Sequence, residues 1–405
     1  MASSTVRNIR PSNGASATRF TPFSEFPEPV RSRRQKNFDR IQALLAEEFT
    51  GVTAGGTPVG ELFPITPTGI SLAPVLEAAN ALRGALTDAQ WEEASFAVDD
   101  RAWRAWHNMH TFLIRHGLSL HKLGSSQRDA VLRLIETSSS AAGYETARNV
   151  MKLNEHAGEI TGRPEDYTEW YYWISIFGEP SPTEPWGWQI DGHHLIINCF
   201  IYADQMVMTP DFRGSEPVLA KSGKYAGTRV FHEEESRGLE FMRALTNDQQ
   251  SQAVIGTELP SDVIATAQAD NLTLNYAGIR IGGLTTPQQK RLLDLIELYA
   301  HRIRSGHAEV RMDEVRQHLA QLHFGWIGGH GETSPFYYRI HSPVILIEFD
   351  HNPGIIWDNT EPTRDHIHTI VRTPNGNDYG RDLLRQHYEL NDHSHPHTDH
   401  RRGLS

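Results

Sequence analysis

The chain has 405 residues, of which 38% are hydrophobic and 22% charged, and a formal net charge of −12. This composition is typical of a globular protein and excludes a disordered one, which cannot bury enough apolar surface to offset the entropy of ordering. An acidic chain without clustered Lys and Arg is not expected to bind nucleic acid, because phosphate binding depends on such clusters. The single cysteine, Cys199, excludes an intrachain disulfide.

The order of segments predicts one folded domain between two tails. Residues 1–26 are rich in small and polar residues and lack the apolar core of a signal peptide, so we expect a disordered or extended arm. Residues 391–405 form a His-rich tail that we expect to be flexible, which leaves residues 27–390 as a single domain. No apolar run is long enough to span a membrane, so we expect a cytoplasmic protein without a membrane partner. The oligomeric state is open, and a homodimer is one option.

Helical patterns dominate residues 36–165. In the segment 36–49, apolar side chains recur at steps of three and four residues, which is typical of an amphipathic helix with one buried face. The side chains that form this face are Phe38, Ile41, Leu44, Leu45 and Phe49.

Three short sequences predict helix N-termini by one shared signal. Thr87, Thr246 and Thr285 each follow a leucine and precede a glutamine by three residues. In a capping box, the Thr hydroxyl accepts a hydrogen bond from the N3 amide, and the Gln side chain accepts one from the N-cap amide. We interpret the three boxes as local caps rather than as marks of a repeated domain, because similarity stops after each box and true repeats extend over ~20–50 residues.

Aromatic and β-branched residues bounded by Pro and Gly predict strands in four segments. These segments are 169–180, 186–203, 339–350 and 365–373, and helical patterns occupy 233–256 and 284–323. The acidic run at 232–236 fits the first turn of a helix, where carboxylates complement the helix dipole. The order helices, strands, helices, strands predicts an α+β fold, with a helical N-terminal half packed on a mainly antiparallel sheet that carries the histidine motifs.

The sequence WGWQIDGHH at residues 186–194 contains the first histidine pair. On a continuous strand, side chains alternate, so His193 shares a face with Asp191 while His194 lies on the other face. Only one imidazole can then enter a given pocket, unless Gly192 introduces a bulge. The structural alternative is a pair of hydrogen-bonded histidines at the rim of a sheet.

A second pair, His366 and His368, has the spacing that sends both imidazoles to the same side of a strand. Many metalloenzymes obtain two ligands from such an arrangement. The alternative is a solvent-facing strand edge, because this spacing arises easily by chance in a chain with 22 histidines.

A third group lies in the strand segment around residues 337–351, where His341 precedes a buried stretch that ends in Glu348 and Asp350. The two carboxyl groups share a strand face, where they repel each other unless a cation, an arginine or a shared proton intervenes. The alternative is a strand that becomes polar only because it leaves the core.

Three segments of this chain resemble signature stretches of the DUF3500 family, whose function is undefined: FGEPSPTEPWGWQIDGHHL, YYRIHSPVILIEFD and DHIHTIVRTPNGNDYGRDLLRQHY. The stretch DDRAWRAWHN and the region around Gly117 are similar too, so the resemblance extends over most of residues 35–390. It implies one family-length domain and no particular activity. Because the histidines fall within the family's recognisable motifs, the resemblance favours a functional role for them.

We therefore expect a metal-dependent enzyme. His366 and His368 would bind a divalent transition metal (Zn, Fe, Mn or Cu) together with one of His193 or His194, and with His341 as a further candidate ligand. Three neutral imidazoles with an open position suit hydrolysis at zinc, which we favour slightly, whereas two histidines and a carboxylate suit oxygen chemistry at non-haem iron.

The remaining candidates have supporting roles in this hypothesis. Glu348 or Asp350 would be a further ligand or a general base, and Arg339 and Arg372 would hold a carboxylate or phosphate group of a small-molecule substrate. Two alternatives stay open: a binding protein without turnover, and metal-free acid/base catalysis by Asp191 with a histidine.

Overall fold

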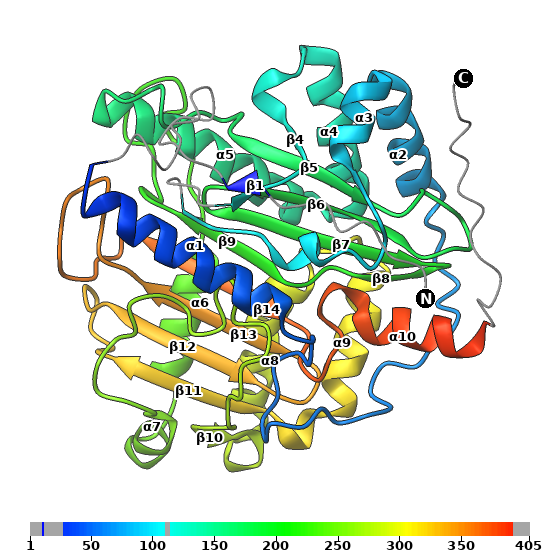
Figure 1. Ribbon diagram of the computed structural model, residues 1–405. Coiled ribbons are helices and arrows are strands. Elements are labelled where there is room, and N and C mark those ends of the chain that lie inside the picture. The colour runs from blue at the N-terminus through cyan, green and yellow to red at the C-terminus, as the bar shows by residue number, and fades with distance from the viewer. Residues whose placement is uncertain (1–9, 12–26, 110–113, 392–405) are drawn as a thin grey trace, which may run out of the picture.

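The computed structural model describes residues 10–11, 27–109 and 114–391 (Figure 1). The predicted arm at 1–26 and the predicted tail at 391–405 lie almost entirely outside these residues. The α+β prediction is confirmed, because helices pack on a 12-stranded sheet in which only the pairing of β2 with β5 is parallel. Within the described part of the chain, no helix is long and apolar enough to cross a bilayer.

The first half of the chain supplies the helices predicted there. They are α1 (Val30–Ala46), α2 (Ala73–Ala85), α3 (Asp88–Ala94), α4 (Ser125–Ser138) and α5 (Ala141–Thr161). Helix α1 buries Ile41 and Leu45 of its predicted apolar face, whereas Phe49 lies beyond its C-terminal end. The strands of the first half are β2 (Ser95–Phe96), β3 (Ile114–Arg115), β4 (Leu118–Ser119), β5 (Tyr172–Phe177), β6 (Trp186–Gly192), β7 (Leu195–Tyr202), β8 (Gln205–Val207) and β9 (Asp211–Ser215). The short strand β1 (Arg10–Pro11) pairs with β3.

The second half contains another set of helices followed by strands. The helices are α6 (His232–Arg243), α7 (Asn247–Ala253), α8 (Thr286–Ala300), α9 (His307–Gln317) and α10 (Arg381–Leu390). The acidic run does form the first turn of α6, as predicted. The strands are β10 (Ile279–Arg280), β11 (His323–Gly328), β12 (Phe336–His341), β13 (Leu346–His351) and β14 (Ile367–Arg372).

The sheet has an internal symmetry that the sequence analysis missed. Its order is β10-β11-β12-β13-β14-β9-β7-β6-β5, and β4 pairs with the outer side of β5. Apart from the short strands β2 and β8, which pair with β5 and β7, each half of the chain contributes a two-residue strand and four longer strands, and the halves meet where β14 pairs antiparallel with β9. Behind this seam, the α4–α5 junction meets the α8–α9 junction through backbone hydrogen bonds between Ser140 and Arg302 and between Arg304 and Ser138.

The capping boxes take equivalent places in the two halves. All three predicted boxes form, at the starts of α3, α7 and α8, and Gln127 makes the corresponding N3 contact with Gly124 at the start of α4. The box glutamines also pair between helices, Gln90 with Gln127 and Gln249 with Gln288. The interpretation as unrelated local caps is therefore corrected: the boxes mark the same positions in a structural repeat.

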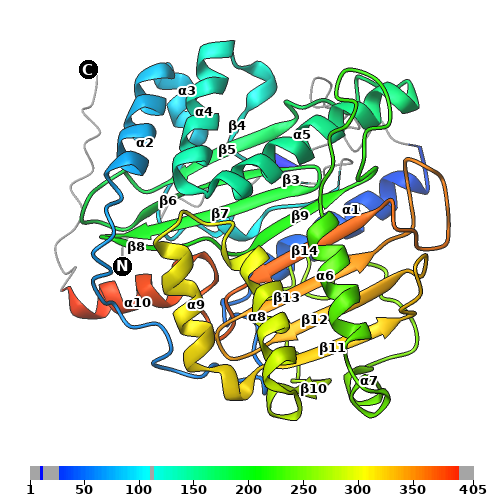
Figure 2. The same cartoon turned by 180° about the vertical axis from the view of Figure 1, so that it is seen from behind.

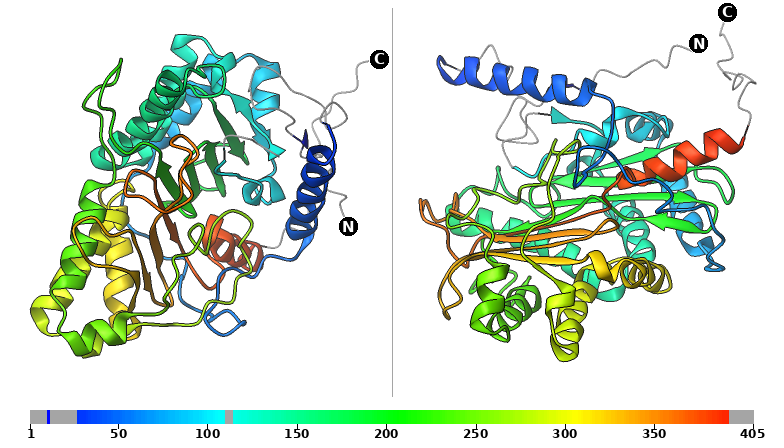
Figure 3. Two further views of the ribbon diagram at one scale, coloured as in Figure 1. Left: turned by 90° about the vertical axis from the view of Figure 1, so that its left-hand side faces the viewer. Right: turned by 90° about the horizontal axis from the view of Figure 1, so that it is seen from below.

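The two faces of the sheet are covered differently. Helices α4, α5, α6, α8 and α9 cover one face, seen from behind in Figure 2, while α1 and α10 lie on the opposite side (Figure 3). The largest apolar core fills the space on the first side, and a smaller core under α1 includes Ile41, Trp106 and Phe212. The ring of His368 packs against Phe212 at 5.1 Å, so this histidine projects from the α1 side of the sheet.

Candidate metal centre

Three histidines from both halves of the chain meet beside the seam of the sheet. His194 comes from the connection between β6 and β7, His366 directly precedes β14, and His368 is the second residue of β14. All three side chains are buried, with 7%, 5% and 7% of the residue surface exposed, respectively. The site thus brings His194 together with His366 and His368, which lie 172 and 174 positions further along the chain.

The first histidine pair lies in a turn and not on a continuous strand, which corrects the predicted geometry. Gly192 pairs with Leu195, so His193 and His194 are the two loop residues of a hairpin. The backbone of His194 has φ +61°, a value that tight hairpin turns require but that non-glycine residues seldom adopt. The turn separates the functions of the two side chains: His194 enters the cluster, whereas His193 Nδ1 lies 2.7 Å from Asn154 Oδ1.

The three Nε2 atoms converge on a common point. The Nε2–Nε2 distances are 3.0 Å between His366 and His368, 3.1 Å between His368 and His194, and 3.3 Å between His366 and His194. Three nitrogens at ~2.05 Å from a tetrahedral metal ion are separated by about 3.3 Å. The cluster therefore has nearly the dimensions of three ligands around one metal ion.

Hydrogen bonds at the opposite ring nitrogens orient two of these imidazoles. His366 Nδ1 lies 2.6 Å from the carbonyl oxygen of Pro353, and His368 Nδ1 lies 2.7 Å from Asp262 Oδ1. Both rings point Nδ1 at an oxygen acceptor, so Nε2 of each ring faces the cluster. Burial, followed by the neighbouring His368, lowers the pKa of His366 to about 3, which keeps this ring neutral near pH 7.

Gly214 leaves space for two of the histidine rings because it has no side chain. Gly214 on β9 is the cross-strand partner of His368, and its amide donates to the carbonyl of His194 at 2.8 Å. A Cβ atom at this position would lie 2.6 Å from His368 Cδ2 and 3.1 Å from His194 Cδ2. Two of the three imidazoles can therefore take their observed positions only because residue 214 lacks a side chain.

Two carboxyl groups border the cluster at His368. One oxygen of Asp262, one oxygen of Asp350 and one ring nitrogen of His368 lie within 4.8 Å of one another. These three atoms are potential metal ligands. Burial would raise the pKa of Asp262, but the interaction with His368 outweighs this effect and lowers it. Burial, followed by the neighbouring Asp262, raises the pKa of Asp350 well above its ordinary value. The two carboxyl groups are thus shifted in opposite directions by their surroundings.

The cluster approaches solvent at Asp262, whose side chain is 29% exposed. Asn108 links the same edge to the histidines: its carbonyl accepts from the His194 amide at 3.1 Å, and its side-chain amide donates to Asp262 at 3.4 Å. On the other side, Glu216 Oε2 lies 3.6 Å from His366 Nδ1. The three histidines are thus nearly buried, while Asp262, which contacts His368, is partly exposed.

Two other candidates on the same half of the sheet lie outside the cluster. His341 packs against Tyr276 at a ring distance of 4.6 Å, and within the described residues neither of its ring nitrogens has a hydrogen-bond partner. Burial, followed by Arg339, lowers the pKa of His341 to about 3. Arg339 donates to the carbonyl of Asn275 at 3.4 Å. The structure therefore does not bring His341 to the metal ligands or Arg339 to a substrate position.

Glu348 is held by a loop and does not join Asp350 at the centre. Its carboxylate accepts from the amides of Ile264 and Ala265 at 2.7 and 2.9 Å, and from the Tyr337 hydroxyl at 2.8 Å. These bonds attach the loop that carries Asp262 to the sheet. Glu348 and Asp350 share a face of β13 and interact, as predicted, but only Asp350 borders His368, while Glu348 holds the loop.

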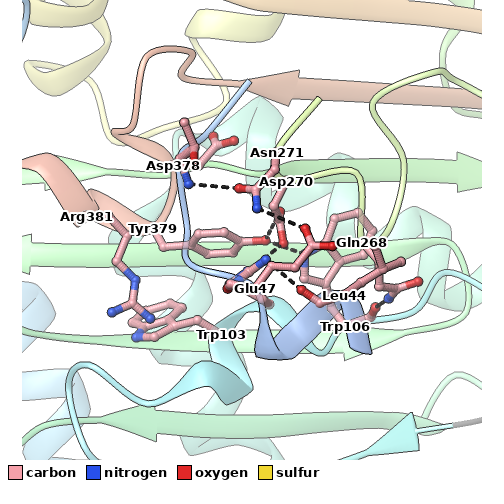
Figure 4. A network of polar contacts seen from close by, with 12 residues as sticks. Leu44, Glu47, Trp103, Trp106, Gln268, Asp270, Asn271, Asp378, Tyr379 and Arg381 are labelled. Carbon is pink, nitrogen blue, oxygen red and sulfur yellow. Dashed lines mark hydrogen bonds and ion pairs between the residues drawn. The ribbon is translucent and has the colours of Figure 1, made fainter. Parts of the chain in front are cut away.

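Arg372 belongs to a buried network and does not face the histidines. Its guanidinium contacts Asp270 and Asp378, both at 3.0 Å. Asp270 also accepts from the Tyr379 hydroxyl, which itself accepts from the indole nitrogen of Trp106, and Figure 4 shows the hydroxyl and the carboxylate pointing toward each other. With its charge already neutralised by two carboxylates, Arg372 has no free group to offer an anionic substrate.

Asp191 likewise has a structural partner. It forms a buried ion pair with Arg115 at 3.0 Å and accepts from the His107 amide at 3.3 Å. Burial raises the pKa of Asp191 to about 6. The expected pairing of Asp191 with a neighbouring histidine of the motif is not found in this arrangement.

Sequence reasoning missed Asp262, Glu216, Asn108 and Gly214. Asp262 lies in an irregular segment about 100 residues from His368, and no spacing pattern connects the two. Gly214 carries no chemical group, so only the positions of its neighbours reveal its importance. For these residues the sequence contains no signal that local patterns could have detected.

Comparison with known proteins places the chain in a family without giving it an activity. No curated protein and no solved structure is significantly similar to it. A family model described as "Protein of unknown function (DUF3500)" matches residues 68–381, a range that contains all three clustered histidines. Since this match covers most of the chain, the protein belongs to the DUF3500 family.

Proposed function

We propose that His194, His366 and His368 bind one divalent transition metal ion through Nε2, and that the protein is a metal-dependent enzyme acting on a small organic substrate. The observation that carries this proposal is the convergence of three buried Nε2 atoms at 3.0–3.3 Å. Three lone pairs directed at one point repel each other unless a cation lies between them. Hydrogen bonding alone accounts poorly for the arrangement, because the Nδ1 atoms of His366 and His368 already have acceptors.

The donor set favours zinc and hydrolysis over oxygen chemistry at iron. An iron site with two histidines and a carboxylate needs a carboxylate oxygen beside the ring nitrogens that bind the metal. Asp262 instead contacts the opposite ring nitrogen of His368, as a supporting carboxylate does in many zinc sites. A zinc ion with three imidazole ligands keeps one position open and lowers the pKa of a bound water to about 7.

The protein's own groups would assist this chemistry in distinct ways. Asp262 would orient His368 and strengthen it as a ligand, and the Pro353 carbonyl would orient His366, with the Glu216 carboxylate 3.6 Å from the same nitrogen. Asp350 lies beside the cluster, and its Oδ2 atom has no hydrogen-bond partner within the described residues. We do not favour an anionic substrate, because Asp270 and Asp378 already neutralise the charge of Arg372. A cytoplasmic location stays a prediction from the sequence.

Elemental analysis of the purified protein tests the metal directly. We expect about one Zn, Fe, Mn or Cu ion per chain, or saturation at that stoichiometry on addition of one of these metals. The double variant His366→Ala/His368→Ala should bind none, whereas the control His301→Ala/His318→Ala, altered on the α8 and α9 side, should bind the wild-type amount. A wild-type protein that neither contains nor takes up metal would refute the proposal.

A second assay separates the reaction classes. The metal-loaded protein is tested against a panel of esters, amides and lactones, with oxygen consumption recorded in parallel. Metal-dependent hydrolysis that is lost in the His366→Ala/His368→Ala variant supports the favoured reaction. Oxygen uptake without hydrolysis would assign the protein to the oxidoreductases, and metal binding without either activity would favour a non-catalytic binding protein.

A further inference from the structure

Exposed apolar side chains gather on the segments that hold the histidine cluster. Eight large hydrophobic residues are exposed within the described part of the chain, and three of them, Met109, Ile355 and Trp357, lie next to residues bonded to the cluster. Their exposed fractions are 45%, 56% and 50%. Of the other five, Tyr388 and Leu390 lie together on α10, and Val59, Ile160 and Val254 lie on separate segments.

Hydrogen bonds place Ile355 and Trp357 close to His366. Glu216 accepts from the amides of both residues, at 2.9 and 3.1 Å, and the same carboxylate lies 3.6 Å from His366 Nδ1. The Ile355 nitrogen is therefore within about 6.5 Å of this imidazole and the Trp357 nitrogen within about 9 Å, given the span of a carboxylate group. The same loop bonds His366 directly, because the carbonyl oxygen of Pro353 lies 2.6 Å from His366 Nδ1.

Met109 approaches the cluster from the opposite side. The preceding residue, Asn108, bonds both the backbone of His194 and the carboxylate of Asp262. Asp262 is also the half-buried group through which the centre meets solvent. Met109 thus lies beside the Asp262 side of the centre, and Ile355 and Trp357 lie beside its Glu216 side.

The size of this apolar surface suits a small molecule better than a protein. At their exposed fractions the three side chains present roughly 300 Å² of apolar area, well below the ~800 Å² that each partner buries in a stable protein interface. It is close to the area that one aromatic ring with its substituents covers. The loop of Ile355 and Trp357 is moreover fixed by polar bonds to Glu216, so its side chains are held outward instead of packing into the core.

We propose that Met109, Ile355 and Trp357 form an apolar rim of the metal centre and select substrates that carry an aromatic or branched aliphatic group beside the metal-binding oxygen function. This inference rests on the proposed metal centre. It assigns the specificity of the site to residues outside the ligand set, and it predicts a neutral, partly apolar substrate.

Two metal-chelating probes that differ only in the apolar group test the inference. Binding of acetohydroxamate and of benzohydroxamate to the zinc-loaded protein is measured by calorimetry, after zinc content has been established separately. We expect benzohydroxamate to bind at least about tenfold more tightly, because the phenyl ring adds apolar area that the rim can bury. In Trp357→Ala this preference should fall at least fivefold while the affinity for acetohydroxamate stays unchanged, and Tyr388→Ala, an exposed aromatic on α10, should behave as wild type.

The outcomes distinguish this inference from the proposal on which it rests. A protein that binds no zinc refutes the metal centre itself. A protein that binds zinc, but binds both hydroxamates equally or neither of them, overturns the apolar rim and leaves the metal centre standing. A preference that persists undiminished in Trp357→Ala also overturns the assignment to the rim.

Discussion

Substitution of Gly214 by alanine should disrupt the metal centre without changing any ligand. The added Cβ atom would lie 2.6 Å from His368 Cδ2, 3.1 Å from His194 Cδ2 and 3.0 Å from the Ile367 carbonyl oxygen. An ordinary carbon–carbon contact is about 3.5 Å or more, so the rings must move by several tenths of an ångström. Such overpacking of a well-packed site costs typically about 1–3 kcal/mol.

The effect on metal affinity follows from the geometry of the ligands. Both rings next to Gly214 are needed to place Nε2 atoms 3.1 Å apart. Changes that only reorient ligands reduce metal affinity by about 10- to 100-fold, and moving two ligands at once should produce a loss at the upper end of this range. Competition with a zinc-chelating dye measures the affinity, and thermal unfolding with and without zinc measures the stabilisation that the metal confers.

A matched control is available at Gly282, where an added Cβ would meet no atom within 4 Å. Gly282→Ala should keep the wild-type zinc affinity and unfolding temperature. If Gly214→Ala binds zinc as tightly as the wild type, then the histidines do not act as ligands in the positions described, and the reasoning from their packing is refuted.

Two further substitutions test the groups around the centre and the buried histidine outside it. Asp262→Asn keeps a hydrogen-bond acceptor for His368 but removes the charge, so zinc affinity should fall about tenfold in the dye competition; unchanged affinity would show that the carboxylate does not support the ligand. Burial lowers the pKa of His341 to about 3, so the unfolded chain binds the extra proton below its ordinary pKa of 6.5, and stability falls as the pH decreases through that range. In urea unfolding at pH 7 and pH 5, His341→Leu should reduce the loss of stability by about 2 kcal/mol. Equal losses in both proteins would contradict this.

Features that depend only on residues close together in the sequence could be predicted. The capping boxes at Thr87, Thr246 and Thr285 depend on contacts within four residues, and all three form. The composition of the strand segments also identified β5, β6, β7, β12, β13 and β14, but not β9 or β11. By contrast, the turn at His193 and His194 has its positive φ because β6 and β7 pair around it, and a histidine by itself gives no sign of this conformation.

The site required the long-range pairing of the two halves. The His366–His368 spacing does place both rings on one side of β14, as the alternation of a strand implies. The choice of His194 over His193, the support from Asp262 and the space at Gly214 arise only where β14 meets β9 and the hairpin that follows β6. The repeat itself escaped detection because the two halves share few residues apart from their capping positions.

X-ray absorption spectroscopy of the metal-loaded protein tests the central claim most directly. The account predicts one metal ion per chain with three imidazole nitrogens at about 2.0–2.1 Å and one light ligand in the remaining position, if zinc is bound. The imidazole scattering should disappear in His366→Ala/His368→Ala. A metal surrounded mainly by oxygen ligands, or one whose imidazole scattering survives in that variant, would contradict the three-histidine centre.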